Sequence, residues 1–121
     1  MNKCGTIKMK QTETQLVKAC LELLNYKKIM AWRNNTGAFR TERGGFYRMG
    51  LLGSGDIFAV MLPNGTLLAI ECKVGRGVQS PSQCKFQATL EANKGIYWLI
   101  RSVDELVDRV EDYKTKLKHL N

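Results

Sequence analysis

Two carboxylates and a lysine flank a predicted β-hairpin in the middle of the chain. Two apolar runs surround Asn64-Gly65, and an Asn-Gly pair between such runs is a strong hairpin signal. With Asn64 and Gly65 as a two-residue turn, Asp56 lies opposite Lys73. Residues that are opposite each other, or two apart on one strand, share a face of the sheet. Asp56, Glu71 and Lys73 are therefore expected to converge at the open end of the hairpin.

The chemistry of this cluster depends on the hairpin register. A three-residue loop, Pro63 to Gly65, would place Asp56 opposite Cys72 and turn its carboxylate to the other face. In the favoured register, the two carboxylates can hold a hard divalent cation and stabilise charge on a phosphate. The alternative is a cluster of surface ion pairs, which contributes little to stability.

The elements around the hairpin predict a mixed sheet flanked by helices, an α/β domain. Residues 35–55 are rich in Gly and Arg and are predicted to be irregular; so long a loop in a compact domain is usually functional. Apolar spacing and capping signals, among them the capping-box pattern of Thr12 with Gln15, predict the order α-β-β-β-α-β with an extra C-terminal helix. The expected helices are 12–26, 80–94 and one that starts after Ser102, and the expected strands are 29–34, 57–62, 66–73 and 96–100.

Two further polar residues lie at predicted helix starts. Glu13 precedes Leu16 and Val17 by three and four residues, so it shares their inward face. It is either an acid favoured at a helix N-terminus or a third carboxylate of the site. Gln83 follows Ser80 by three residues, which is a capping-box pattern. Glu13 and Gln83 can each stabilise a helix start, contribute to the site, or do both.

Composition indicates a single globular domain over residues 1–121 with a polyanionic partner. The formal charge is +8, and the first 103 residues carry fifteen Lys or Arg against six acids. The cysteines form no C-x-x-C pair, so Cys20, Cys72 and Cys84 are interpreted as reduced thiols. We expect residues 1–10 to be weakly held. Without a signal peptide or membrane segment, we expect an intracellular, cytoplasmic protein.

The motifs together resemble the VRR-NUC (virus-type replication-repair nuclease) branch of the PD-(D/E)xK nucleases, over roughly residues 10–102. The residue before Asp56 is Gly55, where the superfamily is named for a proline. The resemblance implies a restriction-endonuclease-like αβββαβ core. It is carried by Glu13 in the first helix, the Arg33-Asn34-Asn35-Thr36-Gly37 run, Gly53-Ser54-Gly55-Asp56, Ile70-Glu71-Cys72-Lys73, Ser80-Pro81-Ser82-Gln83 and Gly95.

The resemblance implies an endodeoxyribonuclease dependent on Mg²⁺ or Mn²⁺. Asp56, Glu71 and the Cys72 backbone carbonyl would bind the metal, with Glu13 reaching it directly or through water. Lys73 would orient the attacking water and offset the charge on the phosphate. Gln83 resembles a glutamine that supports such sites through hydrogen bonds.

The expected substrate is DNA recognised by shape, because no motif that reads base edges is present. Stand-alone phage-type members of the family are associated with branched DNA, especially Holliday junctions in DNA repair, and symmetric cutting requires a homodimer. The alternatives are a non-catalytic DNA-binding accessory module and a single-strand or RNA-directed nuclease. The expected DNA contacts, mainly to phosphates, are Arg33, Asn35, Arg40, Arg43, Arg48 and Arg76.

Overall fold

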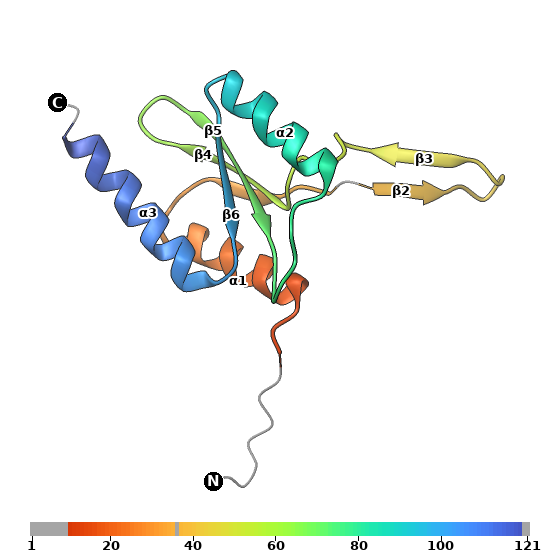
Figure 1. Cartoon of the computed structure of the whole chain (residues 1–121), viewed down its shortest axis with the longest axis horizontal. Coiled ribbons are helices and arrows are strands. Elements are labelled where there is room, and N and C mark those ends of the chain that lie inside the picture. The colour runs from red at the N-terminus through yellow and green to blue at the C-terminus, as the bar shows by residue number, and fades with distance from the viewer. Residues whose placement is uncertain (1–9, 36, 120–121) are drawn as a thin grey trace, which may run out of the picture.

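The computed structural model describes residues 10–35 and 37–119 and has one main sheet and three helices in this part of the chain (Figure 1). The predicted α/β domain with a mixed sheet flanked by helices is confirmed. The elements are α1 (Glu13–Tyr26), β1 (Ala31–Arg33), β2 (Gly37–Arg40), β3 (Phe46–Met49), β4 (Ile57–Met61), β5 (Thr66–Cys72), α2 (Pro81–Ala92), β6 (Ile96–Ile100) and α3 (Val103–Lys118). The expectation about residues 1–10 falls almost wholly on 1–9, which lie outside the described residues.

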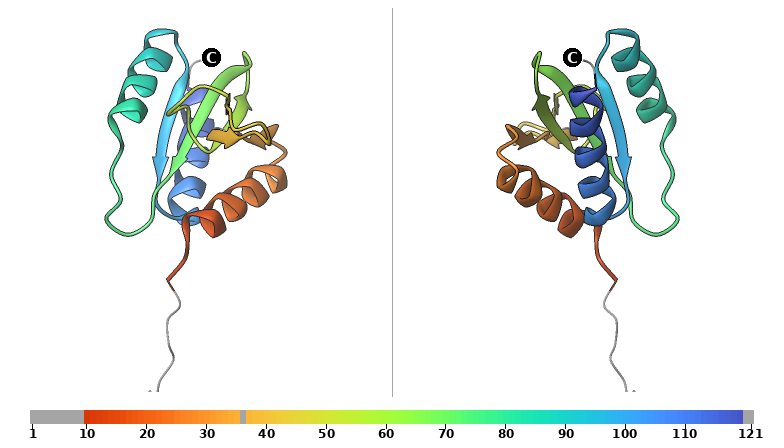
Figure 2. Two further views of the ribbon diagram at one scale, coloured as in Figure 1. Left: turned by 90° about the vertical axis from the view of Figure 1, so that its right-hand side faces the viewer. Right: turned by 90° about the vertical axis from the view of Figure 1, so that its left-hand side faces the viewer.

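The main sheet has the strand order β1-β4-β5-β6 and separates two helical layers. β4 is antiparallel to β1 and β5, and β6 is parallel to β5. Helices α1 and α3 cover one face and α2 covers the other (Figure 2). The buried core lies on the α1/α3 face, where Leu16 and Leu24 of α1 and Leu106 of α3 pack on the sheet. Because strand side chains alternate between the two faces, burial of the apolar residues on this face places the intervening residues on the α2 face.

Local capping signals set the helix starts. Thr12 and Ser80 each form a capping box with the residue three positions later, as predicted. Ser102 caps α3 by accepting a hydrogen bond from the Glu105 N–H at 3.1 Å. Helix α2 ends at Ala92, two residues before the predicted end. No helix in the described ranges is long and apolar enough to cross a membrane.

The β4–β5 hairpin differs from the predicted register by two residues. Met61 pairs with Thr66, so the connection spans four residues, 62–65, and not Asn64-Gly65 alone. The Gly65 N–H donates to the Met61 carbonyl at 2.9 Å and closes this turn. A shift of two residues keeps every side chain on its predicted face. Asp56 consequently lies level with Glu71 and not with Lys73.

The prediction that residues 35–55 are irregular is wrong for part of this segment. β2 and β3 form a two-stranded antiparallel sheet of their own, with Arg40 opposite Phe46. This β2–β3 ribbon projects away from the main sheet (Figure 1). Sequence patterning missed it because its strands are short and carry no polar–apolar alternation that marks a half-buried face.

The cysteines in the described residues form no disulfide with one another. Cys20 of α1 and Cys72 of β5 are fully buried, whereas Cys84 lies exposed on α2. A side-chain hydrogen bond with Cys20, and next burial, raises the pKa of the Cys72 thiol, so this side chain stays protonated within the core.

Candidate metal and active site

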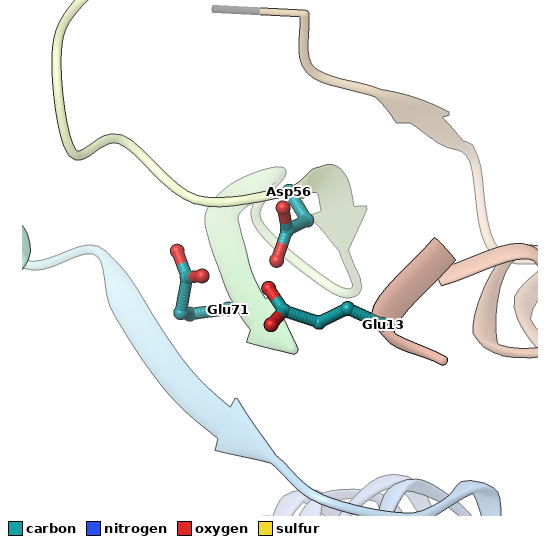
Figure 3. A group of neighbouring side chains, drawn as sticks. All are labelled: Glu13, Asp56 and Glu71. Atoms are coloured by element: carbon teal, nitrogen blue, oxygen red, sulfur yellow. The ribbon is translucent and has the colours of Figure 1, made fainter. Parts of the chain in front are cut away.

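Three carboxylates meet at the end of the sheet where β5 finishes. Glu13 begins α1, Asp56 immediately precedes β4, and Glu71 is the penultimate residue of β5 (Figure 3). One carboxylate oxygen from each lies within 4.8 Å of the others. Carboxylates so close repel one another unless a proton or a cation lies between them. The predicted convergence of Asp56 and Glu71 is therefore present, with Glu13 as a third member.

Backbone interactions hold Asp56 in position. Its N–H donates to the Ile70 carbonyl at 2.8 Å, and its Oδ2 accepts the Cys72 N–H at 2.7 Å. Gly55 before it has a φ of +102°, and a Cβ there would lie 3.1 Å from the Ile70 oxygen. Proline has φ near −65° and cannot adopt this conformation. The glycine before Asp56 thus has a local physical reason in this chain.

Glu71 is buried, with 3% of its surface exposed. Burial, and next the negative charge of Asp56, raises the pKa of the Glu71 carboxyl to about 8 from an ordinary value of 4.5. Lys73 opposes this shift, and the charge of Glu13 adds to it. A surface ion-pair cluster, the alternative weighed from sequence, would need exposed carboxylates, and Glu71 does not fit that description.

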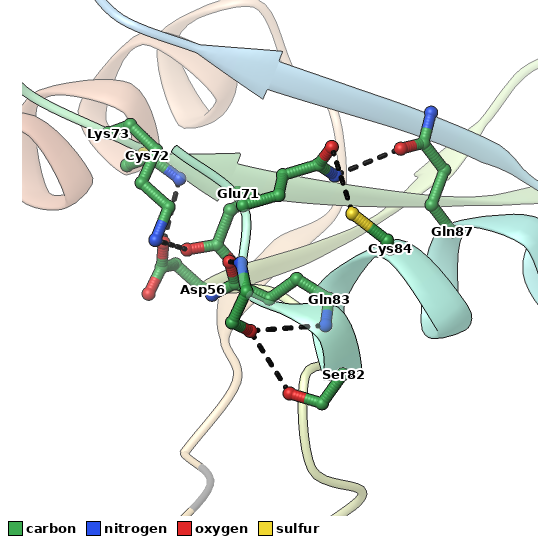
Figure 4. A network of polar contacts seen from close by, with 10 residues as sticks. Asp56, Glu71, Cys72, Lys73, Ser82, Gln83, Cys84 and Gln87 are labelled. Carbon is green, nitrogen blue, oxygen red and sulfur yellow. Dashed lines mark hydrogen bonds and ion pairs between the residues drawn. The ribbon is translucent and has the colours of Figure 1, made fainter. Parts of the chain in front are cut away.

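Lys73 and Cys72 complete the end of β5 (Figure 4). The Lys73 Nζ lies 3.8 Å from Glu71 Oε2 and its side chain is mostly buried. The Cys72 N–H points toward Asp56. The N–H and C=O of one strand residue point to the same side, so the Cys72 carbonyl also faces the Asp56 side of β5. This orientation is compatible with the predicted role of that carbonyl as a metal ligand.

Glu13 and Gln83 both occupy helix starts, as their sequence contexts indicated. Glu13 is exposed as a residue, although its carboxylate reaches the other two acids. Gln83 Oε1 accepts the Ser80 N–H at 2.8 Å, which is the capping-box bond. Its side-chain oxygen therefore acts as a cap, and Figure 4 draws it together with the polar contacts of Asp56 and Glu71.

Asn34 supports the site, a role that the sequence analysis did not assign. Its Nδ2 donates to Ser54 Oγ at 2.7 Å and to the Gly55 carbonyl at 3.0 Å. Its backbone N–H donates to the Asp56 carbonyl at 2.8 Å. Ser54 is 2% exposed. These bonds join the chain before β2 to the chain after β3, and the signal that could have found them is the polar Asn34 following an apolar strand.

An aromatic row lies on the α2 face of the sheet, beside the acids. Trp32, Phe58, Phe86 and Tyr97 follow one another with ring centroids 6.1, 6.4 and 6.3 Å apart. The register places Phe58 on the face that also carries Asp56 and Glu71. Asp56 and Glu71 thus share one face of the sheet with apolar aromatic side chains.

The predicted DNA contacts are dispersed over the surface around the site. Arg33 ends β1, Asn35 follows it and Arg76 lies after β5, and all three are exposed. Arg40 and Arg43 are exposed on the β2–β3 ribbon, and the Arg48 side chain lies outside the described part of the structure.

The site combines carboxylate oxygens from three segments of the chain with the ammonium group of Lys73. Glu71 and Lys73 are largely shielded from solvent. Such a donor set suits a hard divalent cation, which prefers carboxylate and carbonyl oxygens. In comparisons with known proteins, no protein-family model matches the chain, and no curated protein or solved structure matches it significantly.

Proposed function

We propose that the protein is a metal-dependent, structure-specific DNA endonuclease of the VRR-NUC type, with a restriction-endonuclease-like core. The observation that carries the proposal is the convergence of Glu13, Asp56 and Glu71 beside Lys73. The element order supports it, since α1, β1, β4, β5, α2 and β6 follow the αβββαβ sequence of that core, with the β2–β3 ribbon inserted between the first two strands.

The residues present fit Mg²⁺ or Mn²⁺. Asp56 and Glu71 would be carboxylate ligands, the Cys72 carbonyl would add a neutral oxygen, and Glu13 is placed to contribute directly or through water. Burial first, and next the negative charge of Asp56, raises the pKa of Glu71, and the single lysine beside it does not offset this shift. A bound divalent ion would supply Lewis acidity toward the phosphate and would lower the pKa of a water molecule.

The protein's own residues position and polarise the substrate. Asp56 is held by its hydrogen bonds to β5, so the carboxylate that would bind the divalent ion keeps a fixed position relative to the substrate. Lys73 presents a positive charge next to Glu71 and would stabilise the negative charge that develops on the scissile phosphate. The buried stem of Lys73 limits the directions in which its ammonium group can point.

The substrate in this proposal is branched DNA, such as a Holliday junction. The net charge of +8 favours a polyanion, and one site of this kind cuts one strand. Symmetric cleavage of a junction in DNA repair then requires a homodimer related by a two-fold axis.

A cleavage assay tests the proposal. The protein is incubated with Mg²⁺ or Mn²⁺ and with a labelled four-way junction, a flap, a linear duplex and a single strand. Symmetric cuts in the junction support the proposal, and a metal chelator should abolish them.

Other outcomes of the same assay identify the alternatives. Binding of the junction without cleavage in either metal would indicate an accessory DNA-binding module. Cleavage of single-stranded DNA or RNA in preference to the junction would indicate a single-strand or RNA-directed nuclease.

A further inference from the structure

The β2–β3 ribbon is supported by little besides itself. Of the described elements, β2 packs closely against β3 alone, and the pair extends away from the main sheet (Figure 1). A two-stranded hairpin of this kind is marginally stable in water. Its turn is nevertheless well formed, because Thr41 N–H donates to the Gly45 carbonyl at 2.7 Å and Gly45 N–H donates to Thr41 Oγ1 at 3.0 Å.

The exposed surface of the ribbon is basic and aromatic. Residues 37–49 carry three arginines and one glutamate. Arg40 lies over the Phe46 ring, 5.6 Å from its centroid, and 74% of the Phe46 surface is exposed. Arg43 is exposed in the turn. This combination favours a polyanion over a second copy of the chain, which would bring a ribbon of the same charge.

The base of the ribbon is joined to the candidate active site. Asn34, three residues before β2, bonds to Ser54 and Gly55, and its N–H bonds to the Asp56 carbonyl. Anything held by the ribbon is therefore kept at a restricted distance from the three carboxylates. From Gly37 to Arg40 the ribbon extends about 10 Å, at about 3.3 Å per residue, and the turn that carries Arg43 lies beyond this point.

We propose that the β2–β3 ribbon is an arm that enters the major groove of a duplex segment beside the scissile phosphate, with Arg40 and Arg43 as its DNA contacts. The major groove of B-DNA, about 12 Å wide, admits a two-stranded β-ribbon. The arm makes double-stranded DNA next to the cut a requirement for tight binding. Its link to cleavage rests on the proposed nuclease function, whereas its binding to duplex does not.

A charge-matched pair of double variants tests the arm. Arg40→Ala with Arg43→Ala removes two charges from the ribbon, and Lys116→Ala with Lys118→Ala removes two from the far end of α3. Affinity is measured with chelator present, on a duplex and on a single strand of the same length. We expect the ribbon variant to bind duplex about tenfold or more weakly, with a salt-dependence slope shallower by about 2. Its single-strand affinity and the control variant should match the unmodified protein.

Groove-specific chemistry provides the second measurement. Methylation of guanine N7 blocks the major groove, so it should interfere with binding on one side of the cut site and lose that effect in the ribbon variant. Equal loss of affinity in both double variants would show that the ribbon arginines contribute only through the overall positive charge of the protein, and this result would overturn the proposal. A ribbon variant with altered oligomeric mass and unchanged duplex affinity would also overturn it, by making the ribbon a contact between copies.

The two proposals fail separately. Ribbon-dependent duplex binding without cleavage in Mg²⁺ or Mn²⁺ would sink the nuclease and leave the arm intact. Cleavage of the junction at equal rates by the unmodified protein and the ribbon variant, with equal affinities, would sink the arm alone.

Discussion

The acidic end of the main sheet and the β2–β3 ribbon are neighbours in the chain, but the protein constructs them in opposite ways. At the acidic end, Asp56 and Glu71 are tied to buried strands and surrounded by packed side chains. On the ribbon, Arg40, Arg43 and Phe46 are exposed and β2 packs closely against β3 alone. Negative charge is concentrated at the acidic end of the sheet, and positive charge is concentrated on the ribbon.

This difference matches the demands of the two proposed tasks. Chemistry on a phosphate requires ligands held within a fraction of an ångström, which only a packed sheet supplies. Recognition of DNA by shape requires reach and positive charge, which an exposed ribbon supplies. Substitutions at the acidic end should therefore change cleavage, and substitutions in the ribbon should change binding.

The largest effect is expected at the carboxylates and the lysine. Asp56→Asn, Glu71→Gln or Lys73→Ala should each reduce the cleavage rate by about 10³-fold, because each removes a metal ligand or the charge that faces the phosphate. DNA affinity in chelator should stay within a factor of about three, since these groups are not the main phosphate contacts. Single-turnover cleavage and a binding titration measure the two quantities, and full activity in any variant would place the site elsewhere.

Two glycines test the difference in packing directly. Gly53 and Gly44 have φ values of +81° and +83°, so alanine is strained equally at both. A Cβ at Gly53 would lie 2.6 Å from the Ser82 carbonyl, whereas a Cβ at Gly44 would have nothing within 4 Å. We expect Gly53→Ala to lower the free energy of unfolding by about 2–4 kcal/mol and Gly44→Ala by about 1 kcal/mol. Chemical denaturation measures both, and equal losses would contradict the comparison.

The buried Glu71 predicts a pH dependence of stability in metal-free protein. Its pKa is raised to about 8 in the folded protein from 4.5, so between these values the folded state holds a proton that the unfolded state releases. The stabilisation is complete below pH 4.5 and is lost as pH rises toward 8. The difference of about 3.5 between the two pKa values corresponds to a loss on the order of 5 kcal/mol.

Glu71→Gln supplies the control for this pH dependence, because glutamine keeps the shape and cannot titrate. Urea denaturation in chelator at several pH values should show a smaller decline in the variant than in the unmodified protein. In the unmodified protein, addition of Mg²⁺ in place of the chelator should also reduce the decline in stability with pH, because the ion favours the deprotonated carboxylate. Identical profiles for the two proteins would show that Glu71 does not titrate in this range.

The smallest effect is expected at Gln83, where two variants distinguish a helix-capping role from a role in the candidate site. Gln83→Glu keeps the side-chain oxygen that accepts the Ser80 N–H and removes the amide nitrogen. Ser80→Ala removes the hydroxyl that accepts the Gln83 N–H at the start of α2. Ser80→Ala should cost about 1 kcal/mol of stability. If Gln83 also supports the site, Gln83→Glu should lose cleavage activity with stability retained, and unchanged activity would leave Gln83 as a cap alone.

Features set by residues close in sequence were predicted well. Thr12 with Gln15, Ser80 with Gln83, and Ser102 mark the three helix starts, because a cap joins groups only three residues apart. The faces of β4 and β5 were also predicted, since side chains alternate with a period of two. The pairing of Asp56 with Lys73 was wrong by two residues because the turn spans 62–65.

Features set by distant contacts were not predictable in the same way. The hydrogen bond from Asn34 to Ser54 joins residues twenty positions apart, and no local pattern specifies it. The burial of Glu71 and its closeness to Asp56 depend on how the whole domain assembles, so its raised pKa could not be inferred from the E-x-K spacing. The identity of the partner remains a proposal from charge and shape.

The bonds of Asn34 also bear on how this protein could be re-engineered or diversify. They close the chain at the base of the insertion, directly beside Asp56, independently of what residues 37–49 contain. The segment between can then be shortened, lengthened or exchanged while the three carboxylates of the candidate site keep their geometry. If the proposed nuclease function holds, new substrate preferences can be introduced at this insertion without rebuilding the candidate site.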